Sequence, residues 1–226
     1  LADSTLIEDF RWLDDPGWRA RGEVLRLEAN YMLLVENLCD LTHLPFVHRA
    51  SLGTTAIPEN EVPIETRRDG QTLTVERWIE GDTVPPYFTT IAGFERSAKV
   101  DRWMHLVFTP PAMVRLDIGA APAGSGSRAG NRASAATTRN LNAITPETDR
   151  SAHYFWAQAQ DFGLDDPSIS DLDYQLVHKA FLEDMAIIKA QQQNIDLDPA
   201  VPRINIPTDA GGVIAKRIVD ELIDAE

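Results

Sequence analysis

The stretch ENLCDLTHLPFVH, residues 36–48, gathers side chains that can bind a metal ion. Asn37, Asp40, His43 and His48 lie within twelve positions in otherwise apolar surroundings. Polar groups buried without partners cost several kcal/mol, so these side chains need either hydrogen-bond partners or a ligand. Two histidines and a carboxylate from elsewhere can form the facial site of non-haem Fe(II) oxygenases, which leaves coordination positions open for substrate and dioxygen. Two other interpretations stay open: hydrogen-bonded core histidines, and a zinc site, which usually adds cysteine or a third histidine.

Composition restricts the classes of partner. The 226 residues suffice for one domain with a substantial core. The formal net charge of −14 argues against nucleic acid and against anionic membrane surfaces. No apolar run approaches the roughly 20 residues of a membrane span, and no signal peptide is recognisable, so we expect a cytoplasmic protein. The single cysteine, Cys39, excludes an intrachain disulfide and is expected to be a small buried hydrophobe.

The elements that must position these side chains are mostly strands between two helical regions. Residues 23–30 alternate like a half-buried strand, and 31–41 have helical spacing that Pro45 ends or kinks. On such a helix Asp40 and His43 would share a face. Residues 62–81 predict a hairpin that turns at Asp69-Gly70.

The second half of the chain predicts four more strands and two helices. Pro110-Pro111 separates one pair of strands, and the segment TPETD is expected to be the turn of the next pair. A long helix is predicted over 171–195, where apolar residues recur every three or four positions, and a shorter helix from 210 onwards. Together these elements predict an α+β fold, an antiparallel sheet packed by a long C-terminal helix.

Four stretches carry a resemblance to a known family. The pattern N-x-x-D-x-x-H-x4-H, formed by Asn37, Asp40, His43 and His48, resembles the mononuclear-iron motif of Rieske non-haem iron oxygenases of the vanillate O-demethylase and dicamba monooxygenase type. LDDPGW with LEANYMLLVENLCDLTH, AITPETDRSAHYFWAQAQDFG and FLEDMAIIKAQQQNI resemble further stretches of that family. The likeness extends over essentially the whole chain, as one catalytic domain over residues 1–226.

The resemblance implies roles for particular residues. His43, His48 and Asp184 would bind Fe(II), with Glu183 as the rival carboxylate, because neighbouring residues on a helix diverge by about 100°. Asp40 would bridge an iron-ligand histidine and a Rieske-cluster histidine of the neighbouring subunit, and Asn37 would lie near the iron. The implied fold is the helix-grip, or Bet v1/START-like, fold. Its substrate pocket would be lined by Leu116, Asn142, Gln175 and Met113, with a substrate unlike dicamba because of Gln175.

The implied activity is that of an oxygenase component. It would activate O2 at Fe(II) and hydroxylate an aromatic substrate, most simply by O-demethylation of a methoxylated aromatic acid with release of formaldehyde. Ring, benzylic-methyl or N-methyl hydroxylation, a metal-free helix-grip binding protein and a hydrolytic zinc site are the alternatives. The family also carries an N-terminal Rieske domain with a 2Fe–2S cluster, held by C-x-H and C-x-x-H motifs that this sequence lacks. We therefore expect this chain to be the catalytic part of a longer, homotrimeric polypeptide that receives electrons from NAD(P)H through a separate reductase.

Overall fold

A curved antiparallel sheet forms one layer of the molecule. The computed structural model describes residues 8–48, 52 and 62–225. Within these residues seven strands pair in the order β1-β7-β6-β5-β4-β3-β2. Their bounds are β1 Arg19–Leu27, β2 Glu65–Asp69, β3 Thr72–Thr83, β4 Lys99–Thr109, β5 Met113–Pro122, β6 Ala136–Thr148 and β7 Ser151–Gln160. The alternation of successive side chains gives each strand an inward and an outward face, and this alternation decides which residues can reach the site.

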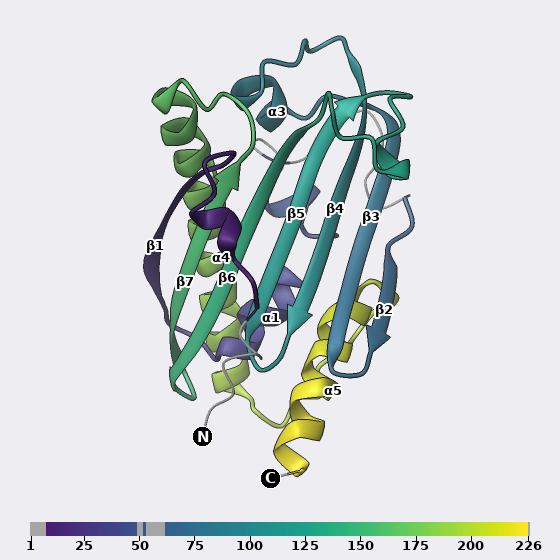
Figure 1. Ribbon diagram of the computed structural model, residues 1–226. Coiled ribbons are helices and arrows are strands. Elements are labelled where there is room, and N and C mark those ends of the chain that lie inside the picture. Colours follow the sequence, from purple (N-terminus) through teal and green to yellow (C-terminus); the bar gives the residue numbers. More distant parts are fainter. Residues whose placement is uncertain (1–7, 49–51, 53–61, 226) are drawn as a thin grey trace.

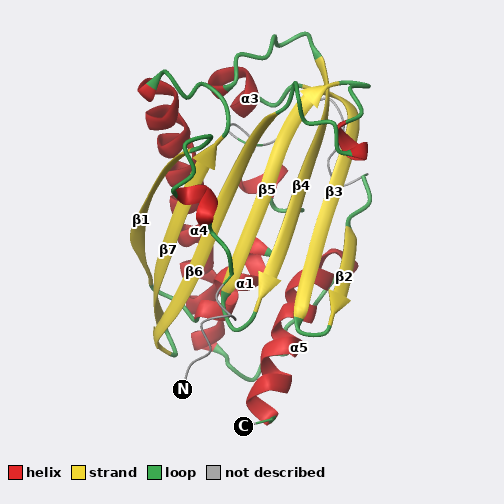
Figure 2. Ribbon diagram, in the orientation of Figure 1, coloured by secondary structure: helices red, strands yellow, loops and turns green. Residues whose placement is uncertain are grey.

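The helices lie together on one side of the sheet (Figures 1 and 2). The long helix α4 packs against β1 and β7, α5 packs against β2 and β3, and α1 packs between α4 and α5. Their bounds are α1 Tyr31–Leu38, α2 Leu44–Val47, α3 Pro86–Ile91, α4 Pro167–Leu197 and α5 Ala210–Asp224. A curved antiparallel sheet with one long helix across it is the helix-grip arrangement, so the predicted α+β fold class is confirmed.

Local sequence explains where these elements begin. Asn30 caps α1, because its side-chain oxygen accepts a hydrogen bond from the backbone N–H of Met32 at 3.0 Å. Asp166 caps α4 in the same way through Ser168 N at 2.9 Å. Between β2 and β3, Gly70 has a φ of 58°, the left-handed conformation that favours glycine, so the predicted Asp69-Gly70 turn is confirmed.

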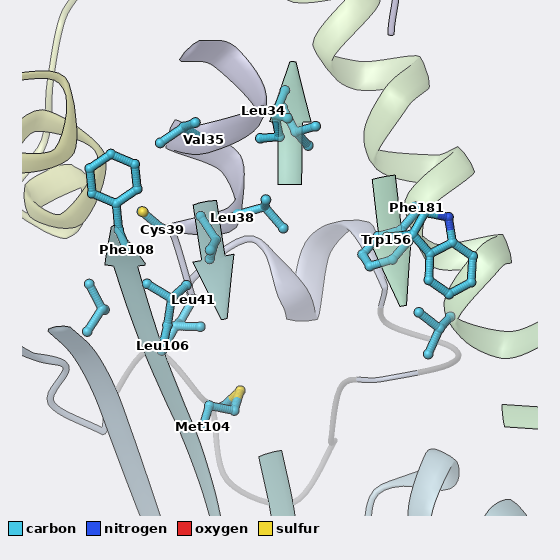
Figure 3. Close-up of a cluster of buried hydrophobic side chains, with 14 of the residues drawn as sticks. Leu34, Val35, Leu38, Cys39, Leu41, Met104, Leu106, Phe108, Trp156 and Phe181 are labelled. Carbon is cyan, nitrogen blue, oxygen red and sulfur yellow. The ribbon is translucent and has the colours of Figure 1, made fainter. Parts of the chain in front are cut away.

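The core fills the space between the helices and the sheet. Figure 3 shows Leu38 and Cys39 near the end of α1 beside Leu106 and Phe108 of β4, while Trp156 and Phe181 meet further along the same layer. Leu106 and Phe108 are completely buried. Each such side chain contributes roughly 1.5–3 kcal/mol on burial. Cys39 is buried, and its burial raises the pKa of the thiol, so it serves as the expected small hydrophobe.

Several predicted bounds are corrected. The turn predicted at TPETD lies further along the chain: β6 continues to Thr148, so only the last residue of TPETD, Asp149, belongs to the turn, together with Arg150. The first helix ends at Leu38, and Pro45 lies in the first turn of the separate helix α2, where its missing N–H costs nothing. The first strand begins earlier than residue 23, because β1 starts at Arg19.

Asp40 and His43 therefore do not share a continuous helix. The Asp40 carboxylate accepts hydrogen bonds from Thr42 N at 2.6 Å and from Thr42 Oγ1 at 2.5 Å. Such a local side-chain turn competes with helical hydrogen bonding, which explains why the helix stops before Asp40. The resulting turn places His43 in the lining of the cavity described below, and both residues in the lining of a second, wider cleft.

Candidate metal centre

Three of the predicted site residues converge from two parts of the chain. His43 precedes α2 and His48 follows it, so the four-residue helix holds the two rings 5.2 Å apart between centroids. Asp184 comes from the middle of α4 and is 3% exposed. The Asp184 Oδ1 atom lies 3.0 Å from His48 Nε2 and 3.6 Å from His43 Nε2. One ligand atom from each of the three residues lies within 4.8 Å of the other two.

The outer nitrogen of each imidazole is held by a different acceptor. His43 Nδ1 lies 2.5 Å from the backbone oxygen of Asp40, and His48 Nδ1 lies 2.9 Å from Glu183 Oε2. Carbonyl and carboxylate oxygens only accept, so both rings carry their proton on Nδ1 when neutral. Each Nε2 therefore presents a lone pair toward Asp184. Glu183 and Asp184 reach opposite nitrogens of the same ring, and only Asp184 faces both histidines.

The donor set has the chemistry of a cation site. In the neutral form, two imidazole lone pairs face a carboxylate oxygen across 3.0 and 3.6 Å. Acceptors so close together repel one another unless a proton or a metal ion lies between them. The same three residue types form the facial site of two histidines and one carboxylate that binds Fe(II). The residues present thus fit the metal that the sequence predicted.

The electrostatics of the two histidines agree with this interpretation. Burial lowers the pKa of His43, against the opposing charge of Asp184. Burial also acts to lower the pKa of His48, but hydrogen bonds and charge from Asp184 and then Glu183 outweigh it, so the pKa of His48 is raised. Positive charge is thus favoured on the ring that lies nearest to Asp184.

Two further predicted residues lie in contact with this group. Asn37, from the last turn of α1, donates from Nδ2 to Asp184 Oδ1 at 3.4 Å and helps to hold the carboxylate. Asp40 contacts His43 through its backbone oxygen, while its side-chain Oδ2 lies 3.9 Å from His43 Nδ1. The Asp40 side chain is 24% exposed, so it lies between the histidine and the surface.

A cavity of about 110 Å³ opens beside the three residues. Most of its lining is apolar: Leu38, Leu41, Leu44, Leu52, Phe88, Met104, Leu116, Ile118, Val177, Ala180 and Phe181. An apolar cavity next to a reactive centre excludes water and favours a ring-shaped apolar ligand. Its polar lining away from the histidines consists of Tyr87, Arg102, Thr138, Asn140 and Gln158.

The chain matches the model of a known protein family. Residues 27–225 match the model described as the vanillate O-demethylase oxygenase C-terminal domain. The chain belongs to this family. The chain is 35% identical to a vanillate O-demethylase oxygenase subunit of a Pseudomonas species, over 100% of this chain and 69% of that protein. It is 37% identical to the iron-sulfur subunit TsaM1 of a toluene-4-sulfonate monooxygenase system of Comamonas testosteroni, over 97% of this chain and 63% of that protein.

Solved structures confirm the fold of this chain. Dicamba monooxygenase bound to 3,6-dichlorosalicylic acid superposes with a TM-score of 0.88 at 26% identity, covering 99% of this chain and 64% of that one. Another structure of dicamba monooxygenase holds non-haem iron and dicamba. The chain thus spans about two thirds of the length of these relatives.

The structure distributes the four predicted pocket residues unevenly. Leu116 lines the cavity. Asn142 is fully buried but donates to the Val114 backbone oxygen at 3.1 Å, accepts from the Tyr154 hydroxyl, and lies outside the lining. Met113, at the start of β5, also lies outside the lining. Gln175 lies on the exposed side of α4, because nine residues at about 100° each place it roughly opposite Asp184.

Sequence reasoning missed the polar part of the lining. Asn140 and Gln158 face the cavity from β6 and β7, and Tyr87 faces it from α3, which was not predicted. Asn140 shares the inward face of β6 with Asn142, so the alternation in TTRNLNAI was the available signal.

Within the described residues no helix combines the length and the apolarity needed to cross a membrane.

Proposed function

We propose that this chain is the mononuclear-iron catalytic domain of an oxygenase that acts on an aromatic methyl ether. His43, His48 and Asp184 would hold Fe(II), which when bound supplies the reductive activation of dioxygen. Insertion of one oxygen atom into the methyl C–H bond gives a hemiacetal, which releases formaldehyde and a phenol. The overall reaction consumes O2, two electrons and two protons and forms one water. The convergence of these three side chains on one point is the observation that carries the proposal.

The chain's own residues prepare the site in three ways. Glu183 and the Asp40 backbone oxygen hold both imidazoles with Nε2 toward the metal position. Asn37 restrains the Asp184 carboxylate from the side of α1. The apolar lining orients the aromatic ring and keeps bulk water away from the oxidised carbon.

Electrons and partners belong to the same proposal. We infer that a Rieske domain of a neighbouring subunit delivers electrons near Asp40, and that a separate reductase supplies them. Two features support this surface: Asp40 and His43 line a second, wide cleft against the end of α4, and Phe46 of α2, next in sequence to Val47 of the cleft lining, is 76% exposed. The relatives' names, an oxygenase subunit and an iron-sulfur subunit of a monooxygenase system, agree with a multicomponent enzyme.

One other reaction has a specific observation in its favour. A relative that is 37% identical is named a toluene-4-sulfonate monooxygenase subunit, which favours hydroxylation of a benzylic methyl group. The same iron site serves both reactions, because only the group placed beside the metal differs. Formaldehyde release from methoxy substrates by the complete polypeptide with its reductase separates them, since benzylic hydroxylation gives an alcohol instead.

Iron content tests the metal centre directly. After anaerobic reconstitution with Fe(II), the wild type is expected to bind about one iron per chain, as one facial site requires. His43→Ala and Asp184→Ala are expected to lose it, whereas the matched control His153→Ala, on the outward face of β7, keeps it. Equal uptake by all four proteins would contradict the assignment and leave a metal-free ligand-binding domain as the better account.

A further inference from the structure

A directional chain of hydrogen bonds ends at the cavity. Asp173 of α4 is 1% exposed, and its Oδ1 accepts from the Tyr87 hydroxyl at 2.5 Å. The Tyr87 oxygen in turn accepts from Gln158 Nε2 at 3.0 Å. Gln158 Oε1 accepts from Asn140 Nδ2 at 3.1 Å. Tyr87, Gln158 and Asn140 all line the cavity, whereas Asp173 lies behind them.

The carboxylate determines the direction of every bond in this chain. An ionised carboxylate only accepts, so the Tyr87 proton points to Asp173 and the Tyr87 oxygen is left to accept. Gln158 must then present its N–H to Tyr87 and its carbonyl to Asn140. Asn140 must present its N–H to Gln158. What remains is Asn140 Oδ1, a buried acceptor with no hydrogen-bond partner among the residues that the structure describes.

A buried acceptor of this kind calls for a donor. Leaving a buried carbonyl oxygen without a hydrogen bond is unfavourable, and a ligand that supplies an O–H or N–H removes this cost. Asn140 is 4% exposed and lines the cavity from the inward face of β6. A ligand carboxylate at the same position would set acceptor against acceptor.

The charges around the cavity also disfavour an anion there. Arg102 is the one lysine or arginine in the described lining, and its Nε donates to Asp82 Oδ2 at 2.7 Å, with both side chains at most 5% exposed. The guanidinium charge is therefore matched within the protein. Asp173 lies behind Gln158, because its Oδ1 is 3.5 Å from Gln158 Nε2, and Gln158 in turn contacts Asn140, so a second negative charge in this part of the cavity would be repelled.

We propose that Asn140 Oδ1 is a specificity-determining acceptor that selects aromatic methyl ethers bearing a phenolic hydroxyl group. This inference rests on the proposed function for the reacting end of the substrate. A carboxylate on the substrate is not what this end of the cavity recognises.

Equilibrium binding to the metal-free protein tests the inference independently of catalysis. Four probes separate the two groups: anisole has neither, guaiacol has the hydroxyl, meta-methoxybenzoate has the carboxylate, and vanillate has both. Dissociation constants come from quenching of tryptophan fluorescence or from calorimetry. We expect guaiacol to bind roughly ten-fold more tightly than anisole, the factor that one neutral hydrogen bond provides, and vanillate to exceed meta-methoxybenzoate by a similar factor.

Substitutions test whether Asn140 Oδ1 causes the preference for the hydroxyl group. Asn140→Leu keeps the branched shape and the number of heavy atoms of the side chain and is expected to remove the ten-fold preference for the hydroxyl. Gln158→Leu frees the Asn140 amide to rotate and is expected to remove it as well, which provides a second test if Asn140→Leu does not fold. The control Met104→Leu exchanges one apolar side chain of the lining for another of similar volume. It is expected to shift all four dissociation constants by the same factor.

The outcomes are distinct. A wild type without the hydroxyl preference, a wild type that selects the carboxylate alone, or a preference that survives in both variants overturns the inference. If the binding preference holds but the complete enzyme releases no formaldehyde, then the proposed reaction fails while the acceptor at Asn140 stands.

Discussion

The difference in unfolding free energy between Asp173→Asn and the wild type is expected to change in favour of the variant as the pH rises. Asp173 is almost completely buried, and burial raises its pKa from the ordinary value of 3.8 to about 6, although hydrogen bonds from Tyr87 and Gln158 oppose the change. Between these two values the folded protein holds a proton that the unfolded chain has released. The unfolding free energy of the wild type therefore falls as pH rises through this window and is constant above it. Asparagine has no such titration.

The size of the effect follows from the two pKa values. Each pH unit between the folded and the unfolded pKa corresponds to about 1.4 kcal/mol. The interval from 3.8 to about 6 therefore gives a total of about 3 kcal/mol, to order of magnitude. The introduced asparagine can still accept from the Tyr87 hydroxyl through its carbonyl oxygen, so the variant keeps the hydrogen bond that closes the network.

Urea denaturation measures this difference. Wild type and Asp173→Asn are unfolded at several pH values between about 4 and about 7.5, and the difference in unfolding free energy is plotted against pH. The variant is expected to gain most of the roughly 3 kcal/mol below pH 7 and nothing further above it. A difference that stays constant across this range would refute the reasoning, because Asp173 would then have the same pKa in the folded and unfolded states.

Two other substitutions probe packing and the histidine supports. Gly119→Ala places a Cβ that overlaps the ring of Trp103 on the neighbouring strand, so a loss of about 1–3 kcal/mol in urea is expected; an unchanged midpoint would show that the ring moves freely. Glu183→Gln removes the charge that holds one imidazole, and Fe(II) affinity is expected to fall roughly ten- to a hundred-fold while the melting temperature changes little. Unaltered affinity in an anaerobic titration would assign Glu183 no part in positioning the ligand.

Sequence patterns predicted most of the framework because they report local rules. Alternation located the strands, the Asp69-Gly70 dipeptide located a turn that needs a positive φ, and three-and-four spacing located the long helix. The bounds that were wrong depended on competing local bonds. The Asp40 side chain captures the Thr42 N–H and stops the helix, and spacing alone does not reveal this competition.

Residue types and their order, read from the sequence alone, determined what chemistry the chain can perform. His43, His48 and Asp184 are the right ligands for a facial iron site, and the family resemblance indicates all three, with Glu183 as the rival carboxylate. Only the tertiary structure decided that Asp184 faces both imidazoles while Glu183 holds the far nitrogen of one. The phase of α4 relative to α2 sets this division of roles, and helix phase depends on packing across the whole domain.

The lining of the cavity depended even more on the tertiary structure than the metal ligands did. Leu116 lines the cavity, but Gln175 lies on the side of α4 opposite Asp184, and Asn142 is hydrogen-bonded to Tyr154 and to the backbone of β5. The acceptor at Asn140 has no sequence signature, because its direction is set through Gln158 by a carboxylate on another element. A sequence lists donors and acceptors, whereas the folded network determines which of them is left for a ligand.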